Sequence, residues 1–142
     1  MKQLFFVLIF FISSHVFTQA GVYIIDNNHK HSDGTKLNWT LTLNEDGTFL
    51  YHFFRDISAI SKANSAEKFY GKGTWQAEGN LVFFYTDKNT EMDDVYKINF
   101  TNSKARYITK SPRDKTDKVV NTALRFYESD LFYIKGLELF KQ

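Results

Sequence analysis

Two histidines and two aspartates near the start of the chain form the cluster with metal-ligand chemistry. His29 and His31 are separated by one residue, and Asp26 and Asp33 lie close to them. Side chains two residues apart point the same way on a strand, and imidazole suits zinc or copper. Because the cluster lies in a polar turn without a clear third ligand, we interpret it as a solvated turn and predict no metal site.

The acidic segment 91–94, EMDD, carries oxygen ligands of the kind that calcium prefers. It lacks the regular spacing and the glycine of a dedicated calcium loop. We interpret it as a second solvated turn.

Catalytic chemistry finds little support in the sequence. Nucleophilic catalysis needs an activated Ser, Thr or Cys beside a base, and none of the histidines stands in such a context. His52, between Leu50 and Phe54, alternates with a row of aromatic residues, so we expect it on an exposed or partner-facing surface. The carboxylates fall mostly in predicted turns, which provides no pair for glycoside hydrolysis. We predict no catalytic residue and no cofactor, and keep an enzyme of unknown reaction as a third possibility.

Residues 1–20 have the three-part plan of a secretory signal peptide. Lys2 supplies a positive charge, Leu4 to Ile12 form an apolar run, and a more polar stretch ends in the small residue Ala20. The apolar run is too short for a transmembrane helix, so we expect no membrane anchor. We predict cleavage near Ala20 and export to the periplasm or the extracellular space, which leaves residues 21–142 as one domain.

Composition narrows the class of protein further. The sequence has no cysteine, which excludes disulfides and thiolate metal sites. Its 18 Lys and Arg nearly balance its 16 Asp and Glu, so we predict no nucleic-acid partner. Aromatic residues make up 18% of the chain, and such side chains pack well on a pleated sheet.

The chain after residue 20 consists of short aromatic and β-branched segments separated by Gly, Asn and Asp. In KLNWTLTL, residues 36–43, apolar and polar side chains alternate, and NEDG then predicts a tight hairpin. Segment 56–68 breaks this pattern and fits a short helix or a loop, and the glycines of GKGTW indicate a bend or close packing by a large neighbour. We predict an all-β fold, an antiparallel up-and-down meander that closes into a barrel of about eight strands.

The sequence also resembles the lipocalin-like, or calycin, group of small exported bacterial proteins. The similar segments are GVY at 21–23, LTLNEDGTFLY at 41–51, GKGTW at 71–75 with the following GNLVFF, and the terminal GLELFK. Tyr23 stands where the lipocalin opening usually has Trp. The resemblance implies an up-and-down barrel whose interior receives an apolar molecule.

We predict a non-enzymatic protein that binds a small apolar ligand or a protein segment inside this barrel. The alternative is a protein-interaction or inhibitor module with a solid core. Some strands are apolar on both faces, which favours an internal cover or a protein partner or second copy on the outer face. The residues expected to line the interior are Trp39, Tyr51, Phe53, Trp75, Phe83 and Tyr96, and those expected to meet a partner are Leu50, Phe54, Val82 and Phe84.

Overall fold

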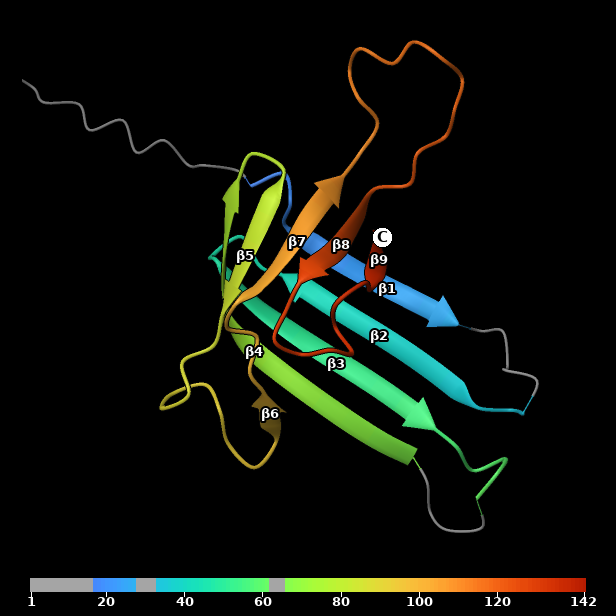
Figure 1. Ribbon diagram of the computed structural model, residues 1–142, viewed down its shortest axis with the longest axis vertical. Helices are drawn as coiled ribbons and strands as arrows, with labels where there is room; N and C mark the ends of the chain where they lie inside the picture. The colour runs from blue at the N-terminus through green and yellow to red at the C-terminus, as the bar shows by residue number, and fades with distance from the viewer. Residues whose placement is uncertain (1–16, 28–32, 62–65) are drawn as a thin grey trace, which may run out of the picture.

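The computed structural model describes residues 17–27, 33–61 and 66–142. These residues form nine strands joined by turns and loops, and no helix (Figure 1). Over these residues there is accordingly no helix long and apolar enough to cross a membrane. The strands are β1 (Gly21–Asn27), β2 (Lys36–Leu43), β3 (Thr48–Asp56), β4 (Ala66–Glu78), β5 (Leu81–Tyr85), β6 (Tyr96–Ile98), β7 (Ser103–Ile108), β8 (Ala123–Glu128) and β9 (Glu138–Lys141).

Eight of the strands close into an antiparallel barrel, which confirms the predicted fold class. Consecutive strands pair from β1 to β5, β5 pairs with β7, and β7 to β9 again pair in order before β9 returns to β1. Closure pairs β1 and β4 with a second neighbour over part of their length, which shortens the open sheet edges. The extra strand β6 pairs in parallel with β4 at Tyr70 and Gly71, beyond the stretch of β4 that β5 covers.

The alternation predicted for residues 36–43 is present in β2. Leu41 and Leu43 are buried, whereas Thr40 and Thr42 are only partly covered. Gly47 closes the hairpin to β3 with a φ of 84°, a conformation that glycine adopts without strain. The predicted Asp-Gly hairpin is therefore confirmed.

Two glycines of β4 let large rings into the barrel. A Cβ atom at Gly71 would lie 2.7 Å from a ring carbon of Phe100, and one at Gly73 would lie 2.1 Å from the carbonyl oxygen of Tyr85 and 2.9 Å from the ring of Phe49. All three distances are shorter than a Cβ atom tolerates, so neither position has room for a side chain. The close packing predicted from GKGTW is confirmed.

The faces predicted for β5 are wrong. Val82 and Phe84 point into the barrel and are buried, whereas Phe83 lies on the outer side with Tyr85. The register explains this orientation, because Phe84 pairs with the inward-facing Trp75 and cross-strand partners share a face. Val82 and Phe84 are thus unable to meet a partner, and Phe83 does not line the interior.

The connection between β3 and β4 and the segment before β9 both consist of turns, which agrees with the loop alternative for the first of them. Between β3 and β4, residues 57–61 form a turn, with the Ile60 N–H donating to the Ile57 carbonyl, rather than a helix; residues 62–65 lie outside the described part. Segment 131–137, LFYIKGL, is rich in apolar and aromatic residues but is a series of turns and not a strand. Gly136, with a φ of 94°, interrupts the extended chain, and β9 begins only after it.

Residues 17–20 pack against the barrel end that is closest to the start of β1. Gln19 is only 8% exposed, and its backbone carbonyl accepts a 2.5 Å hydrogen bond from the buried hydroxyl of Tyr23. The Thr18 carbonyl accepts one of 2.8 Å from the Lys141 ammonium. A cut just before Gly21 would remove all these contacts, whereas a cut upstream of Phe17 would keep them.

We expect a chain that starts at Gly21 to be less stable than one that starts at Phe17. The shorter chain leaves the buried Tyr23 hydroxyl without its acceptor, which costs about 1–3 kcal/mol, and exposes the surface under Gln19. Urea denaturation of the two purified chains measures the difference. Equal unfolding free energies would show that the contacts of residues 17–20 contribute nothing.

Candidate functional site

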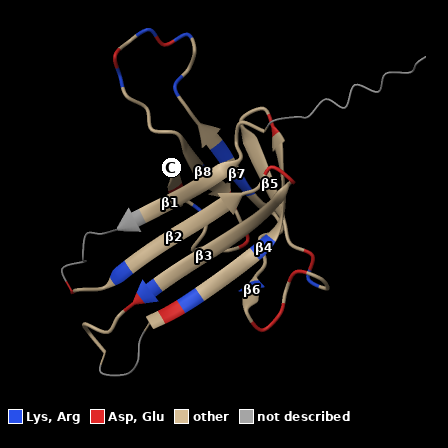
Figure 2. Ribbon diagram, turned by 180° about the vertical axis from the view of Figure 1, so that it is seen from behind, with Lys and Arg blue, Asp and Glu red and all other residues tan. Residues whose placement is uncertain are grey.

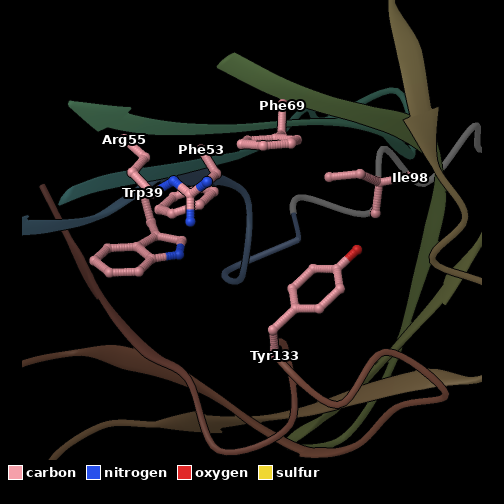
Figure 3. Close-up of a pocket in the computed structure, with 6 residues that line it drawn as sticks. All are labelled: Trp39, Phe53, Arg55, Phe69, Ile98 and Tyr133. Atoms are coloured by element: carbon pink, nitrogen blue, oxygen red, sulfur yellow. The ribbon is translucent and has the colours of Figure 1, made fainter. Parts of the chain in front are cut away.

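A hollow of about 310 Å³ opens at the barrel end opposite residues 17–20 (Figure 3). We call it the mouth pocket. Of its six lining residues, four are aromatic, one is an isoleucine and one is an arginine. They are Trp39, Phe53, Arg55, Phe69, Ile98 and Tyr133.

Three stacked aromatic rings form one wall of the mouth pocket. Trp39, Phe53 and Phe69 are direct partners across β2, β3 and β4, so their inward-facing side chains line up. The ring centroids are 4.9 Å apart in the first pair and 5.6 Å in the second, with 21° between the planes in each. Phe69, at the end of the row, is still 39% exposed, so the wall retains apolar surface that no part of the described chain covers.

The rim of the pocket carries charges. On β2 and β3 the charged side chains occur only at the pocket end, as Lys36, Arg55 and Asp56 (Figure 2). The Arg55 guanidinium donates 2.7 Å from Nε to Glu67 Oε2, and its Nη2 donates to the same oxygen. Both side chains are nearly half exposed, so this pair adds little stability, but it fixes the guanidinium at the rim of the pocket.

Tyr133 forms the wall opposite the rings. It lies in the turns of segment 131–137, which are held to the barrel by the fully buried Ile134 and by a 2.8 Å hydrogen bond from the Gly136 N–H to the Phe126 carbonyl. Its hydroxyl points into the pocket (Figure 3). Burial raises the pKa of this hydroxyl, so it is neutral at physiological pH and can donate a hydrogen bond.

Tyr51 lies one inward-facing position deeper than Phe53 on β3. Its side chain is 1% exposed, and its ring packs edge-on against Phe100 with centroids 4.9 Å apart. Its hydroxyl is buried and has no hydrogen-bond partner among the described residues. Burial, and then the nearby Tyr133, raise the pKa of Tyr51 well above its usual value.

Of the six residues predicted to line the interior, the structure brings Trp39 and Phe53 together in the mouth pocket. Tyr51 lies deeper and Trp75 lies at the opposite end of the barrel, where its indole Nε1 donates 3.0 Å to the Asn44 carbonyl. Phe83 is on the outer face, as described above.

The interior position predicted for Tyr96 is wrong. Its ring packs against Tyr70 at 5.9 Å and under the Lys72 ammonium at 4.3 Å, and both of these side chains alternate with the inward-facing Gly71. Because β6 pairs with β4 outside the ring of eight strands, its side chains do not follow the alternation of the barrel.

Four of the lining residues were not predicted from the sequence: Arg55, Phe69, Ile98 and Tyr133. The two-residue period does extend from Phe53 to Arg55, and pairing β3 with β4 would have added Phe69. Tyr133 lies in a turn, where no periodic pattern indicates which way a side chain points.

The structure also shows where the other predicted sites lie. His52 points outward and stacks on Tyr70, with centroids 4.6 Å apart, and burial followed by the charge of Lys68 lowers its pKa. Leu50 is 46% exposed on the same face. In segment 91–94 the Asp93 carboxylate accepts hydrogen bonds from the Val95 and Tyr96 N–H groups, which confirms a turn.

The predictions for His29 and His31 fall outside the described residues, so the metal question at that turn stays a prediction.

No protein-family model, no curated protein and no solved structure matches the chain. The geometry of the mouth pocket is therefore the basis for assigning a function.

We expect alkaline destabilisation that depends on Tyr51. A tyrosine in the unfolded chain loses its proton near pH 10, whereas folded Tyr51 keeps its proton to higher pH because burial raises its pKa. The stabilisation is complete below pH 10, and above it the unfolding free energy falls by about 1.4 kcal/mol per pH unit for each such tyrosine. In urea titrations between pH 8 and 11, Tyr51→Phe should show a shallower fall than the unmodified protein. Identical slopes would contradict the buried, protonated Tyr51.

Proposed function

We propose that this protein is an exported, non-enzymatic binding protein that holds a small apolar ligand at the mouth of a lipocalin-like barrel. The observation that carries the proposal is the row of three stacked rings along an open hollow of about 310 Å³. Small-molecule pockets are typically concave and mostly apolar, with a few polar groups and volumes of roughly 300–1,000 Å³. The mouth pocket is at the lower end of that range, which favours a ligand of one or two rings.

Apolar burial supplies the affinity in this proposal. Water against the exposed ring of Phe69 is released when a flat molecule covers it, at about 25 cal/mol per Å² of apolar surface. Both hydrogen bonds of the Arg55–Glu67 pair go to Oε2 of Glu67, from Nε and Nη2 of Arg55. The other Glu67 oxygen can therefore accept a hydrogen bond from a ligand at the rim, and Arg55 Nη1 can donate one.

A protein-interaction or inhibitor module is the second candidate. It is favoured by the outer face of β3, where Leu50 is exposed and Phe54 is only half-buried. This surface would bind a protein partner or a second copy of the chain. The ligand-binding proposal comes first because the mouth pocket is concave and apolar, as small-molecule sites are.

Trp39 provides a direct readout of ligand binding. The protein has two tryptophans, Trp39 in the mouth pocket and Trp75 at the opposite end. In ¹H–¹⁵N spectra titrated with 2-naphthol, we expect the indole N–H signal of Trp39 to shift and saturate while that of Trp75 stays in place. Trp75→Phe assigns the two signals.

Phe53→Ala should weaken this binding about tenfold, because it removes the central ring of the wall, and a buried aromatic contact contributes about 1–3 kcal/mol. Phe83→Ala on the outer face of β5 is the matched control and should leave the affinity unchanged. The ligand-binding proposal would be overturned if 2-naphthol caused no saturable shift of the Trp39 signal and native mass spectrometry found no molecule retained from a mixed lipid extract.

Export is the part of the proposal that rests on the leader sequence, with Lys2 and the apolar run from Leu4 to Ile12. We expect protein recovered outside the cytoplasm to begin downstream of that run. Amino-terminal sequencing locates the cut, near Ala20 or upstream of Phe17. A cytosolic product with Met1 intact would contradict export.

A further inference from the structure

The buried hydroxyl of Tyr51 is an unsatisfied polar group inside the barrel. A buried donor without a partner costs about 1–3 kcal/mol, and native proteins pair nearly all such groups. The other unpaired buried atoms of the described residues lie elsewhere: Thr35 Oγ1 just before β2, and His52 Nε2 on the outward-facing side chain of β3. Tyr51 is therefore the inward-facing exception on β3.

Comparable groups at the other end of the barrel are satisfied by the chain itself. The buried Tyr23 hydroxyl donates to the Gln19 carbonyl at 2.5 Å, and the Trp75 indole donates to the Asn44 carbonyl at 3.0 Å. Tyr23 and Tyr51 both pair in register with Leu41, from either side of β2, but of the two only Tyr23 has a hydrogen-bond partner for its hydroxyl among the described residues. The missing partner is thus specific to Tyr51.

Tyr51 lies beneath the mouth pocket, one inward-facing position deeper on β3 than the lining residue Phe53. The side chain shares the inward face of β3 with Phe53, which lines the pocket. Tyr133 lies close enough to raise the pKa of Tyr51 in part. The hydroxyl of Tyr133 itself points into the pocket (Figure 3). A molecule inserted between the ring wall and Tyr133 would direct its inner end toward Tyr51.

We propose that the ligand of the mouth pocket is a flat apolar molecule with a neutral oxygen at its inner end, a phenol, alcohol or carbonyl, which hydrogen-bonds to the Tyr51 hydroxyl. The inference rests on the ligand-binding function proposed above. A tyrosine hydroxyl both donates and accepts, so it accommodates each of these oxygens. A charged oxygen is disfavoured at this depth, because burying an unpaired charge costs far more than burying a neutral polar group.

The test compares two probes of similar shape, 2-naphthol and 2-methylnaphthalene, which differ by a hydroxyl in place of a methyl group. The quantity measured is the ratio of their dissociation constants, taken from the Trp39 indole shift or from calorimetry. We expect Tyr51→Phe to reduce the preference for 2-naphthol about five- to tenfold, the worth of one buried hydrogen bond. Tyr85→Phe, which removes a hydroxyl from the outer face of β5, should leave the ratio unchanged.

The possible outcomes separate this inference from the function on which it rests. If neither probe shifts Trp39, the ligand-binding function fails. If both probes bind and Tyr51→Phe leaves their ratio unchanged, the binding function stands and the role of Tyr51 is overturned.

The stability of the ligand-free protein is the second measurement. Tyr51→Phe removes an unpaired hydroxyl and should leave the urea midpoint unchanged or raise it. A lowered midpoint would show that the hydroxyl already has a favourable partner in the empty protein, and would overturn the inference.

Discussion

The barrel depends on the absence of two side chains on β4. Gly71 leaves room for the ring of Phe100, and Gly73 leaves room for Phe49 and for the backbone at Tyr85. Phe100 can then pack against rings from both sides of the barrel, 5.2 Å from Phe49 and 6.2 Å from Phe126 between centroids. Because protein interiors are packed as densely as organic crystals, a methyl group at either glycine would displace these rings or separate the strands.

Unequal strand lengths explain why the barrel is filled at one end and hollow at the other. β4 has 13 residues, but β5 pairs only with its second half, and β7, β8 and β9 have six residues or fewer (Figure 1). The first half of β4 and its partners on β3 and β2 therefore extend beyond the strands opposite. The ring row belongs to this extension, and among the described residues β6 and segment 131–137 provide the opposite side of the pocket. A hollow remains where a full-length strand would have supplied side chains.

The alternation of apolar and polar residues and the turn residues predicted most of the architecture. They failed where the alternation does not show which side chains of a strand face the core. In β2, polar residues alternate with apolar ones, so only the face that carries the apolar residues could be the buried one. In β5 every residue is apolar or aromatic, so the period of two could not say whether Val82 or Phe83 faces the core; pairing with Trp75 decides it. Tyr133 was out of reach for a different reason, because its direction depends on Ile134 anchoring a turn in the core. The candidate site was thus only partly predictable, through Trp39 and Phe53.

A filled core and an open apolar pocket are parts of one arrangement in this barrel. At the filled end the chain supplies partners to its own buried polar groups, as Gln19 does for Tyr23, and the rings contact one another. That end provides the stability, since dense apolar burial dominates folding free energy. The mouth can then keep features that weaken a fold, an exposed ring at Phe69 and an unpaired hydroxyl at Tyr51. Proteins that depart locally from good packing and hydrogen bonding often do so at functional sites, and these two departures are the physical basis of the binding function that we propose.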